Sequence, residues 1–212
     1  MSRTTADTAR RATLLGLIAV TAGLSGCFGL ALTGAAVGTL AVMDRRSLGA
    51  QTEDQGIELN GLRALNAAFD DGTASVSITS FNRRVLLTGQ AASEAAKLRA
   101  EQVAREATTN IKDLYNELEI SPVASFATRT KDTGLTARVK AALVRERNLS
   151  VNTIKVVSEQ STVYLMGLVT EDESQRAAII ASRVTGATRV ITLFEFISEA
   201  DLARLQGGTE RK

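Results

Sequence analysis

Few side chains in this sequence could carry out chemistry. The 212 residues include no histidine and one cysteine, which excludes a histidine triad, a histidine general base, a histidine metal site and an intramolecular disulfide. Carboxylates remain, most densely in the run Glu171-Asp172-Glu173. Acidic residues at the start of a predicted helix are favoured there by the helix dipole, so this run does not indicate catalysis. We expect a protein that is not an enzyme and that has no metal and no non-covalent cofactor.

Cys27 is the residue with the clearest predicted chemistry. Three arginines lie among the first 11 residues, an uncharged apolar stretch follows, and Leu24-Ser25-Gly26 directly precedes the cysteine. These are the features of a secretory signal peptide. The run Leu24-Ser25-Gly26-Cys27 resembles the lipobox of bacterial lipoproteins. That resemblance implies cleavage before Cys27, a diacylglyceryl group on its sulfur and an acyl chain such as palmitate on the new amine.

The uncharged stretch continues to residue 43, which leaves a second interpretation open. About 20 apolar residues suffice for a transmembrane helix, and residues 12–43 contain no charge. A single-pass inner-membrane anchor is therefore the alternative to acylation. If the chain is cleaved before Cys27, residues 28–43 form a short tether. Phe28 stands where lipoproteins of the inner membrane usually carry aspartate, so the resemblance implies the periplasmic face of the outer membrane.

Beyond the tether, the chain repeats itself with a period near 78 residues. The run Val-Leu-Leu-Thr-Gly at 85–89 corresponds to Val-Tyr-Leu-Met-Gly at 163–167. In each copy this run follows an alternating strand and precedes a helix. The fold class is therefore α+β, with two tandem modules of order helix–strand–strand–helix–strand (αββαβ). Each module has a three-stranded mixed sheet with two helices on one face, and Gly89 and Gly167 are predicted as structural turn residues.

This order of elements, with a glycine closing the second strand, resembles the BON domain. Two copies behind a lipobox resemble the dual-BON outer-membrane lipoproteins of Gram-negative bacteria, and Tyr115-Asn116-Glu117 matches the end of that family's first module. The predicted boundaries are a signal peptide at 1–26, the lipidated cysteine, tether and linker at 27–57, module one at 58–120, a linker at 121–132, module two at 133–197 and a tail at 198–212. The opening helices are expected at 59–69 and 135–147.

The charge of the whole chain hides two unlike modules. The formal charge is +2, but residues 1–26 hold three basic residues and one acidic residue, so the remainder is neutral. Residues 50–120 hold 7 basic and 11 acidic residues, whereas residues 121–197 hold 10 basic and 7 acidic ones. Module one is therefore acidic and module two is basic.

The basic excess of module two gathers on its predicted first helix. At 100° per residue, small apolar residues lie opposite the core stripe and between basic side chains, which suits the headgroup layer of an anionic bilayer. The resemblance also implies that this helix contacts anionic phospholipid. Gly134 stands where relatives can carry an aromatic residue, so we expect a salt-sensitive interaction. The predicted lipid-binding residues are Leu135, Ala137, Arg138, Lys140, Ala141, Val144, Arg145 and Arg147.

The last strand of module two is apolar on both faces, unlike that of module one. Helices on one side of a small sheet should not leave the other side so apolar. We predict that this second face is covered, either by module one or by another protein.

These patterns favour a lipid-anchored periplasmic protein that recognises anionic phospholipid through module two and supports outer-membrane integrity. The alternative is an envelope scaffold that docks other proteins without recognising lipid. The resemblance adds β-barrel assembly and cell-division proteins as partners. Nucleic acid is not expected, because aromatic stacking platforms and a broad basic surface are missing.

Overall fold

The computed structural model describes residues 44–146 and 149–207. The predictions about the signal peptide, Cys27, the tether and Arg147 therefore lie outside the described residues.

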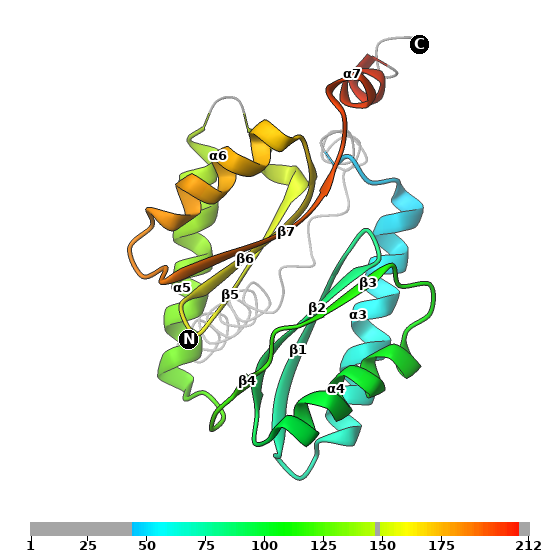
Figure 1. The fold of residues 1–212 in the computed structure, drawn as a ribbon, viewed down its shortest axis with the longest axis vertical. Coiled ribbons are helices and arrows are strands. Elements are labelled where there is room, and N and C mark those ends of the chain that lie inside the picture. The colour runs from blue at the N-terminus through cyan, green and yellow to red at the C-terminus, as the bar shows by residue number, and fades with distance from the viewer. Residues whose placement is uncertain (1–43, 147–148, 208–212) are drawn as a thin grey trace, which may run out of the picture. The chain divides into compact units, whose positions relative to one another are not determined.

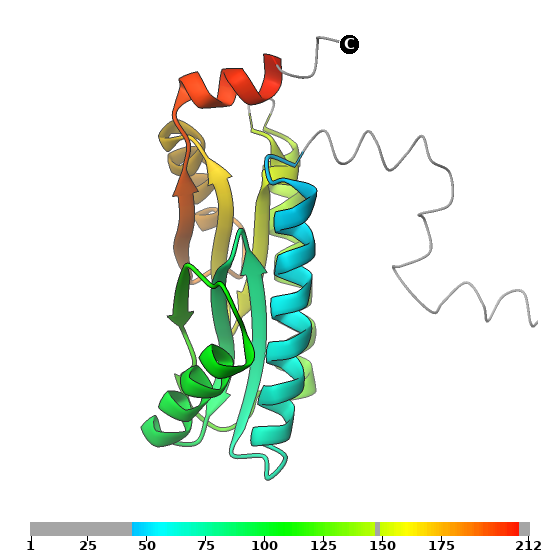
Figure 2. The same ribbon diagram turned by 90° about the vertical axis from the view of Figure 1, so that its right-hand side faces the viewer.

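Module one is an α+β layer with its two helices on one face of the sheet (Figure 1). Strands β1 and β2 form an antiparallel hairpin, and β3 and β4 both pair in parallel with β2. Arg84 pairs with Asp113 and Gln90 pairs with Glu119, which is the same offset, so β3 and β4 are one interrupted strand. Figure 2 shows α3 running along β1. The elements are α3 (Leu48–Ala68), β1 (Ala74–Phe81), β2 (Arg84–Ala91), α4 (Glu94–Ala107), β3 (Asp113–Asn116) and β4 (Glu119–Ile120).

Module two repeats this arrangement. Its sheet has the order β5-β6-β7, with an antiparallel hairpin and a parallel third strand. The predicted fold class is therefore confirmed for both modules. The elements are α5 (Phe126–Val144), a short 3-10 helix (Val151–Thr153), β5 (Ile154–Glu159), β6 (Thr162–Val169), α6 (Glu171–Ser182), β7 (Arg189–Phe196) and a further helix, α7 (Glu199–Gly207).

Both opening helices begin earlier than the sequence pattern predicts. Helix α3 starts at Leu48, where the side chain of Ser47 accepts the amide of Ala50 at 3.1 Å, and α5 starts at Phe126, capped by Ser125. Serine at an N-cap accepts one of the amide groups that have no partner within the helix. Parts of the two segments predicted as linkers, 27–57 and 121–132, are therefore helical.

The added turns place one buried carboxylate in each module against the hairpin turn. Asp54 accepts the backbone amides of Asn82 and Arg83 at 2.7 and 2.8 Å. Asp132 accepts those of Gln160 and Ser161, both at 2.9 Å. These four turn residues have φ between 44° and 66°, a conformation that two-residue hairpin turns require and that is costly for residues other than glycine. The aspartates stabilise it with charge-assisted hydrogen bonds.

Gly89 and Gly167 lie inside strands β2 and β6 rather than in turns, which corrects the predicted turn role. Gly89 has φ of 122°, and a Cβ there would lie 2.0 Å from the carbonyl oxygen of Ser75 on the neighbouring strand. A Cβ on Gly167 would lie 2.6 Å from the carbonyl oxygen of Thr153. Each glycine therefore permits a close approach of two backbones.

The apolar second face of the module two sheet is covered by module one, which confirms that prediction and decides between its two alternatives. Phe81 and Leu86 of module one form a buried cluster with Tyr164, Met166 and Leu193 of module two. All these residues lie on strands, so the two sheets pack face to face. Leu168 and Ile197 are half-buried, whereas Phe196 at the end of β7 is 63% exposed.

The segment that precedes α3 also joins the modules. Arg45 donates two hydrogen bonds to Glu173 of module two, at 2.6 and 2.7 Å, and a third to the carbonyl of Leu168 at 2.9 Å. Next to it, Arg46 pairs with Asp54 at 2.7 Å and lies over the Phe81 ring at 4.0 Å. The chain therefore contacts module two before it enters module one.

Candidate lipid-binding surface

Helix α5 divides into an inward and an outward face. Asp132, Leu135, Val139 and Leu143 are buried, and their spacing of three or four residues puts them on one side of the helix. Leu135 is 2% exposed and belongs to the core of module two. Lipid cannot reach it in this fold, so Leu135 is removed from the predicted lipid-binding set.

The outward face of α5 keeps most of the predicted set. Ala137, Ala141 and Val144 are exposed and form an apolar strip. Arg138 and Arg145 are exposed on one flank and Lys140 on the other. Because α5 begins at Phe126, Lys131 and Arg129 also lie on this helix and extend the two flanks. The sequence pattern placed both ahead of the helix, although Ser125 was a recognisable N-cap signal.

Within the described part of the chain, no salt bridge joins a basic residue of α5 to a carboxylate, although Arg129 interacts electrostatically with Glu159. The side chains concerned are Arg129, Lys131, Arg138, Lys140 and Arg145, whereas several module one cations, including Arg84 and Arg105, do form ion pairs. The only carboxylate on α5, Asp132, faces inward to the hairpin turn. The exposed charged side chains of α5 are therefore all cationic.

Arg138 differs from the other basic residues because it also contacts its own module. Its Nε donates to the carbonyl oxygen of Thr185, in the turn after α6, at 3.2 Å. Lys140 and Arg145 have no such recorded contact in the described residues. These two side chains are therefore the better probes of an electrostatic role.

The cationic surface of α5 is specific to module two, because the equivalent helix of module one does not carry the same basic residues. Helix α3 occupies the same place in module one, and the turn-binding Asp54 and Asp132 fix the alignment of the two helices. In that alignment Glu53 takes the place of Lys131, Asn60 that of Arg138 and Leu62 that of Lys140. An anionic surface would therefore distinguish the two modules.

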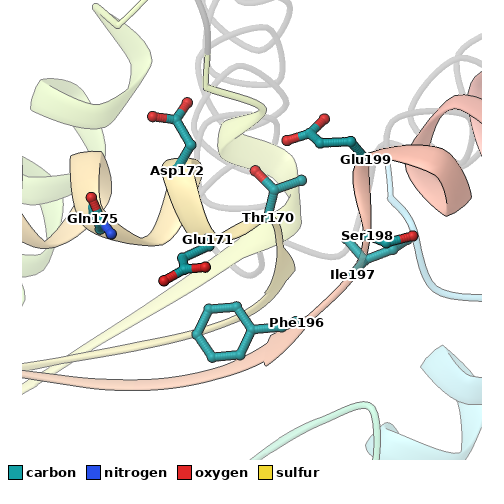
Figure 3. Close-up of a pocket in the computed structure, with 8 residues that line it drawn as sticks. All are labelled: Thr170, Glu171, Asp172, Gln175, Phe196, Ile197, Ser198 and Glu199. Atoms are coloured by element: carbon teal, nitrogen blue, oxygen red, sulfur yellow. The ribbon is translucent and has the colours of Figure 1, made fainter.

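A pocket of about 740 Å³ lies elsewhere in module two, at the start of α6 and the end of β7 (Figure 3). It is lined by the carboxylates of Glu171, Asp172 and Glu199 and by the Phe196 ring. Three carboxylates would repel a phosphate group. The charge of this pocket therefore disfavours an anionic headgroup.

The acidic run at 171–173 has structural roles for two of its members. Asp172 pairs with Arg176 on the next turn, and Glu173 forms a capping box with Thr170. Burial acts to raise the pKa of Glu173, but hydrogen bonds from Arg45 and the Thr170 amide outweigh it and hold the pKa below its usual value. A carboxylate held ionised in this way stabilises the fold.

Among the described residues, no cluster of three or more cysteine, aspartate and glutamate side chains is arranged to hold a metal ion. In the same part of the chain, no helix is both long enough and apolar enough to cross a membrane.

Two modules of the same αββαβ order, packed sheet against sheet, define a tandem-domain protein with a cationic helix on one domain. The BON domain family model matches residues 53–122 and 131–197, and the chain belongs to the BON family.

The relatives place the chain more closely, as a dual-BON outer-membrane lipoprotein. It is 34% identical over 182 residues to a Haemophilus influenzae protein named outer membrane lipoprotein DolP, covering 85% of this chain and 94% of that protein. It is 27% identical to a 21 kDa hemolysin of Actinobacillus pleuropneumoniae, covering 73% of this chain and 80% of the relative. A solved structure of CdsD, from the type III secretion system of Chlamydia trachomatis, aligns with a TM-score of 0.30 and 9% identity over 68% of this chain and 96% of that one. A TM-score this low supports no inference about fold or function.

Proposed function

We propose that this lipoprotein is anchored through lipid on Cys27 at the periplasmic face of the outer membrane. We further propose that it binds anionic phospholipid with helix α5 and so supports outer-membrane integrity. The observation that carries the lipid proposal is the row of basic side chains on α5 that form no salt bridge with any described residue and that flank an exposed apolar strip.

The size of the effect follows from the number of charges. A basic group near an anionic membrane contributes about 1 kcal/mol. Lys140, Arg145, Lys131 and Arg129 together would therefore give on the order of 4 kcal/mol, or about a thousandfold in affinity. The apolar strip is shallow, since alanine and valine side chains insert little hydrocarbon, and Gly134 adds none. Charge therefore dominates the interaction, and salt should weaken it.

Vesicle flotation tests this proposal. A fragment of residues 44–212, which contains both cores, is mixed with vesicles of phosphatidylcholine alone or with added phosphatidylglycerol. We expect flotation only with the anionic vesicles, and loss of it in 0.5 M salt. Reversing Lys140 and Arg145 to glutamate should abolish binding. A matched control reverses Arg63 and Arg183, which are exposed and lie on α3 and at the end of α6, and should retain most of it.

An envelope scaffold without lipid recognition is the second candidate function. It is favoured by the acidic pocket of Figure 3, where Phe196 is 63% exposed, since exposed aromatic residues are typical of protein interfaces. β-Barrel assembly or division proteins would be its partners. Equal flotation with both vesicle types, or none with either, would favour this function over phospholipid recognition.

The anchor is tested separately, because Cys27 lies outside the described residues. In cells labelled with palmitate, the wild-type chain should incorporate label and fractionate with the outer membrane. The Cys27→Ala variant should incorporate none and should lose that fractionation. A variant that stays firmly in the inner membrane without label would support the single-pass anchor instead.

A further inference from the structure

The turn after the second helix of each module contacts the first helix, and the two modules fill this place differently. In module two it is occupied by the guanidinium of Arg138. A Cβ on Gly134 would lie 3.3 Å from Nη1 of Arg138, and a Cβ on Gly186 would lie 3.0 Å from Nη2. With Nε bonded to the carbonyl of Thr185, the guanidinium lies between α5 and the α6–β7 turn.

The corresponding place in module one is open. A pocket of about 180 Å³ lies between α3 and the turn that follows α4. Its lining includes Glu53, Gly56, Asn60, Thr108, Thr109 and Asn110. Asn60 occupies the position of Arg138 and Gly56 that of Gly134, so the pocket is the space that the arginine fills in module two.

Independent contacts support this alignment of the two turns. Lys112 donates its amide to the carbonyl of Arg83 at 2.8 Å, and Thr188 donates its amide to the carbonyl of Ser161 at 2.9 Å. Two residues before each donor, the backbone is left-handed, with φ of 59° at Asn110 and 101° at Gly186. Thr109 therefore corresponds to Thr185, whose carbonyl accepts from Arg138.

The lining of the module one pocket favours a cation. Glu53 stands where module two has Lys131, and its side chain is 51% exposed. Glu53 already forms an ion pair with Nε of Arg83 at 3.6 Å, a separation longer than a hydrogen bond, so its carboxylate can still accept hydrogen bonds from a second cation. Thr109, Asn60 and Asn110 also line the pocket and carry carbonyl oxygens that can accept hydrogen bonds. These groups complement a guanidinium, which offers five donors in a plane and accepts nothing.

We propose that this pocket binds an arginine side chain of a partner protein, in the place that Arg138 occupies in module two. Module one carries a net negative charge, in contrast to the cationic surface of helix α5. This negative charge attracts a cationic side chain of a partner protein toward the pocket. The site lies on module one and does not depend on lipid recognition by α5.

The experiment uses the acylated mature chain in detergent micelles, followed by amide NMR. The probes are N-acetyl-arginine amide, its neutral analogue N-acetyl-citrulline amide, and an acetylated Ala-Ala-Arg-Ala-Ala amide. We expect saturable shifts of the Gly56, Thr109 and Asn110 amides with a millimolar dissociation constant for the arginine amide. The citrulline probe should bind at least tenfold more weakly, and the pentapeptide at least threefold more tightly.

Two variants test the pocket itself. Glu53→Gln should weaken arginine binding about fivefold. Asn60→Arg supplies the arginine from the chain, as module two does, and should abolish binding while the amide signals of module two stay unchanged. If Asn60→Arg does not fold, the affinity of Glu53→Gln for the arginine amide and the affinity of the wild type for the citrulline probe still test the proposal. Equal binding of arginine and citrulline, no saturable shift, or full binding by Asn60→Arg would overturn the proposal, and equal affinity of amide and pentapeptide would exclude a protein arginine as the ligand.

Discussion

The ion pair between Arg45 and Glu173 gives a sharp test of how the modules are held together. Its side chains are 7% and 8% exposed, and removing one partner of such a buried pair typically costs 3–5 kcal/mol. In Arg45→Met, Glu173 keeps the hydrogen bond from the Thr170 amide at 2.9 Å. We therefore expect a loss at the lower end, about 3 kcal/mol.

Thermal unfolding of residues 44–212, followed by circular dichroism, measures this loss. For a unit of this size, 3 kcal/mol corresponds to a decrease in Tm of about 6–12 °C. The double variant Arg45→Met with Glu173→Gln should recover most of it, because the buried charge is gone and glutamine can still accept the Thr170 amide.

The loss should also depend on pH. The pKa of Glu173 is lowered in the folded wild type, so its stabilisation is present at neutral pH and is lost as the pH falls through that pKa. In Arg45→Met the carboxylate lacks its cation, and protonation relieves the burial cost. The difference between variant and wild type should therefore shrink below about pH 4.5. A single variant within 1 kcal/mol of wild type, or a double variant no more stable than the single, would refute this reasoning.

Three further predictions concern stability. Gly89→Ala and Gly167→Ala should each lower the free energy of unfolding by more than about 2 kcal/mol, with the larger loss at Gly89 because its Cβ would meet Ser75 O at 2.0 Å; urea titration measures this, and Gly56→Ala, with nothing within 4 Å of the added Cβ, is the control. Asp132→Ala should cost about 2 kcal/mol, because two turn amides lose their acceptor, and hydrogen exchange should quicken at Gln160 and Ser161; unchanged exchange there would contradict the assigned role. Burial raises the pKa of Glu159 despite the hydrogen bond from Gln90, so its ionised form is disfavoured in the folded state. The wild type therefore gains stability as the pH falls through that pKa. Glu159→Gln should raise Tm at pH 7, and this gain in Tm over the wild type should disappear in acid.

The sequence was sufficient to predict the features that depend on local periodicity and short motifs. Alternating strands and apolar residues at helical spacing predicted both modules, because burial on one face imposes those periods on strands and helices. The capping box of Thr170 and Glu173 was visible as a local motif and is present in the structure. The apolar second face of the last strand also predicted a cover, since exposed apolar area is costly.

Features set by distant contacts were not predictable in this way. The early turns of α3 and α5 lack a strong apolar period. Ser47 and Ser125 are local cap signals, but the aspartates that hold these turns bind hairpin turns far along the chain. Arg45 and Glu173 are 128 positions apart, so nothing local to either residue indicated their pairing. Leu135 is a different case: the helical period already places it on the core stripe of α5, so its burial in the module two core was predictable and its inclusion among the lipid-binding residues was wrong.

The docking of Arg45 on module two has a mechanical consequence. Residue 44 is the end of this unit nearest Cys27, the proposed site of the lipid anchor, so a pull transmitted along the chain from that side meets Arg45 first. Arg45 holds Glu173 and the carbonyl of Leu168, and the load therefore divides between both modules instead of passing through α3 alone. Tension in the envelope would be resisted in parallel by the two hydrophobic cores. The Arg45–Glu173 ion pair would be the first contact to break under that load.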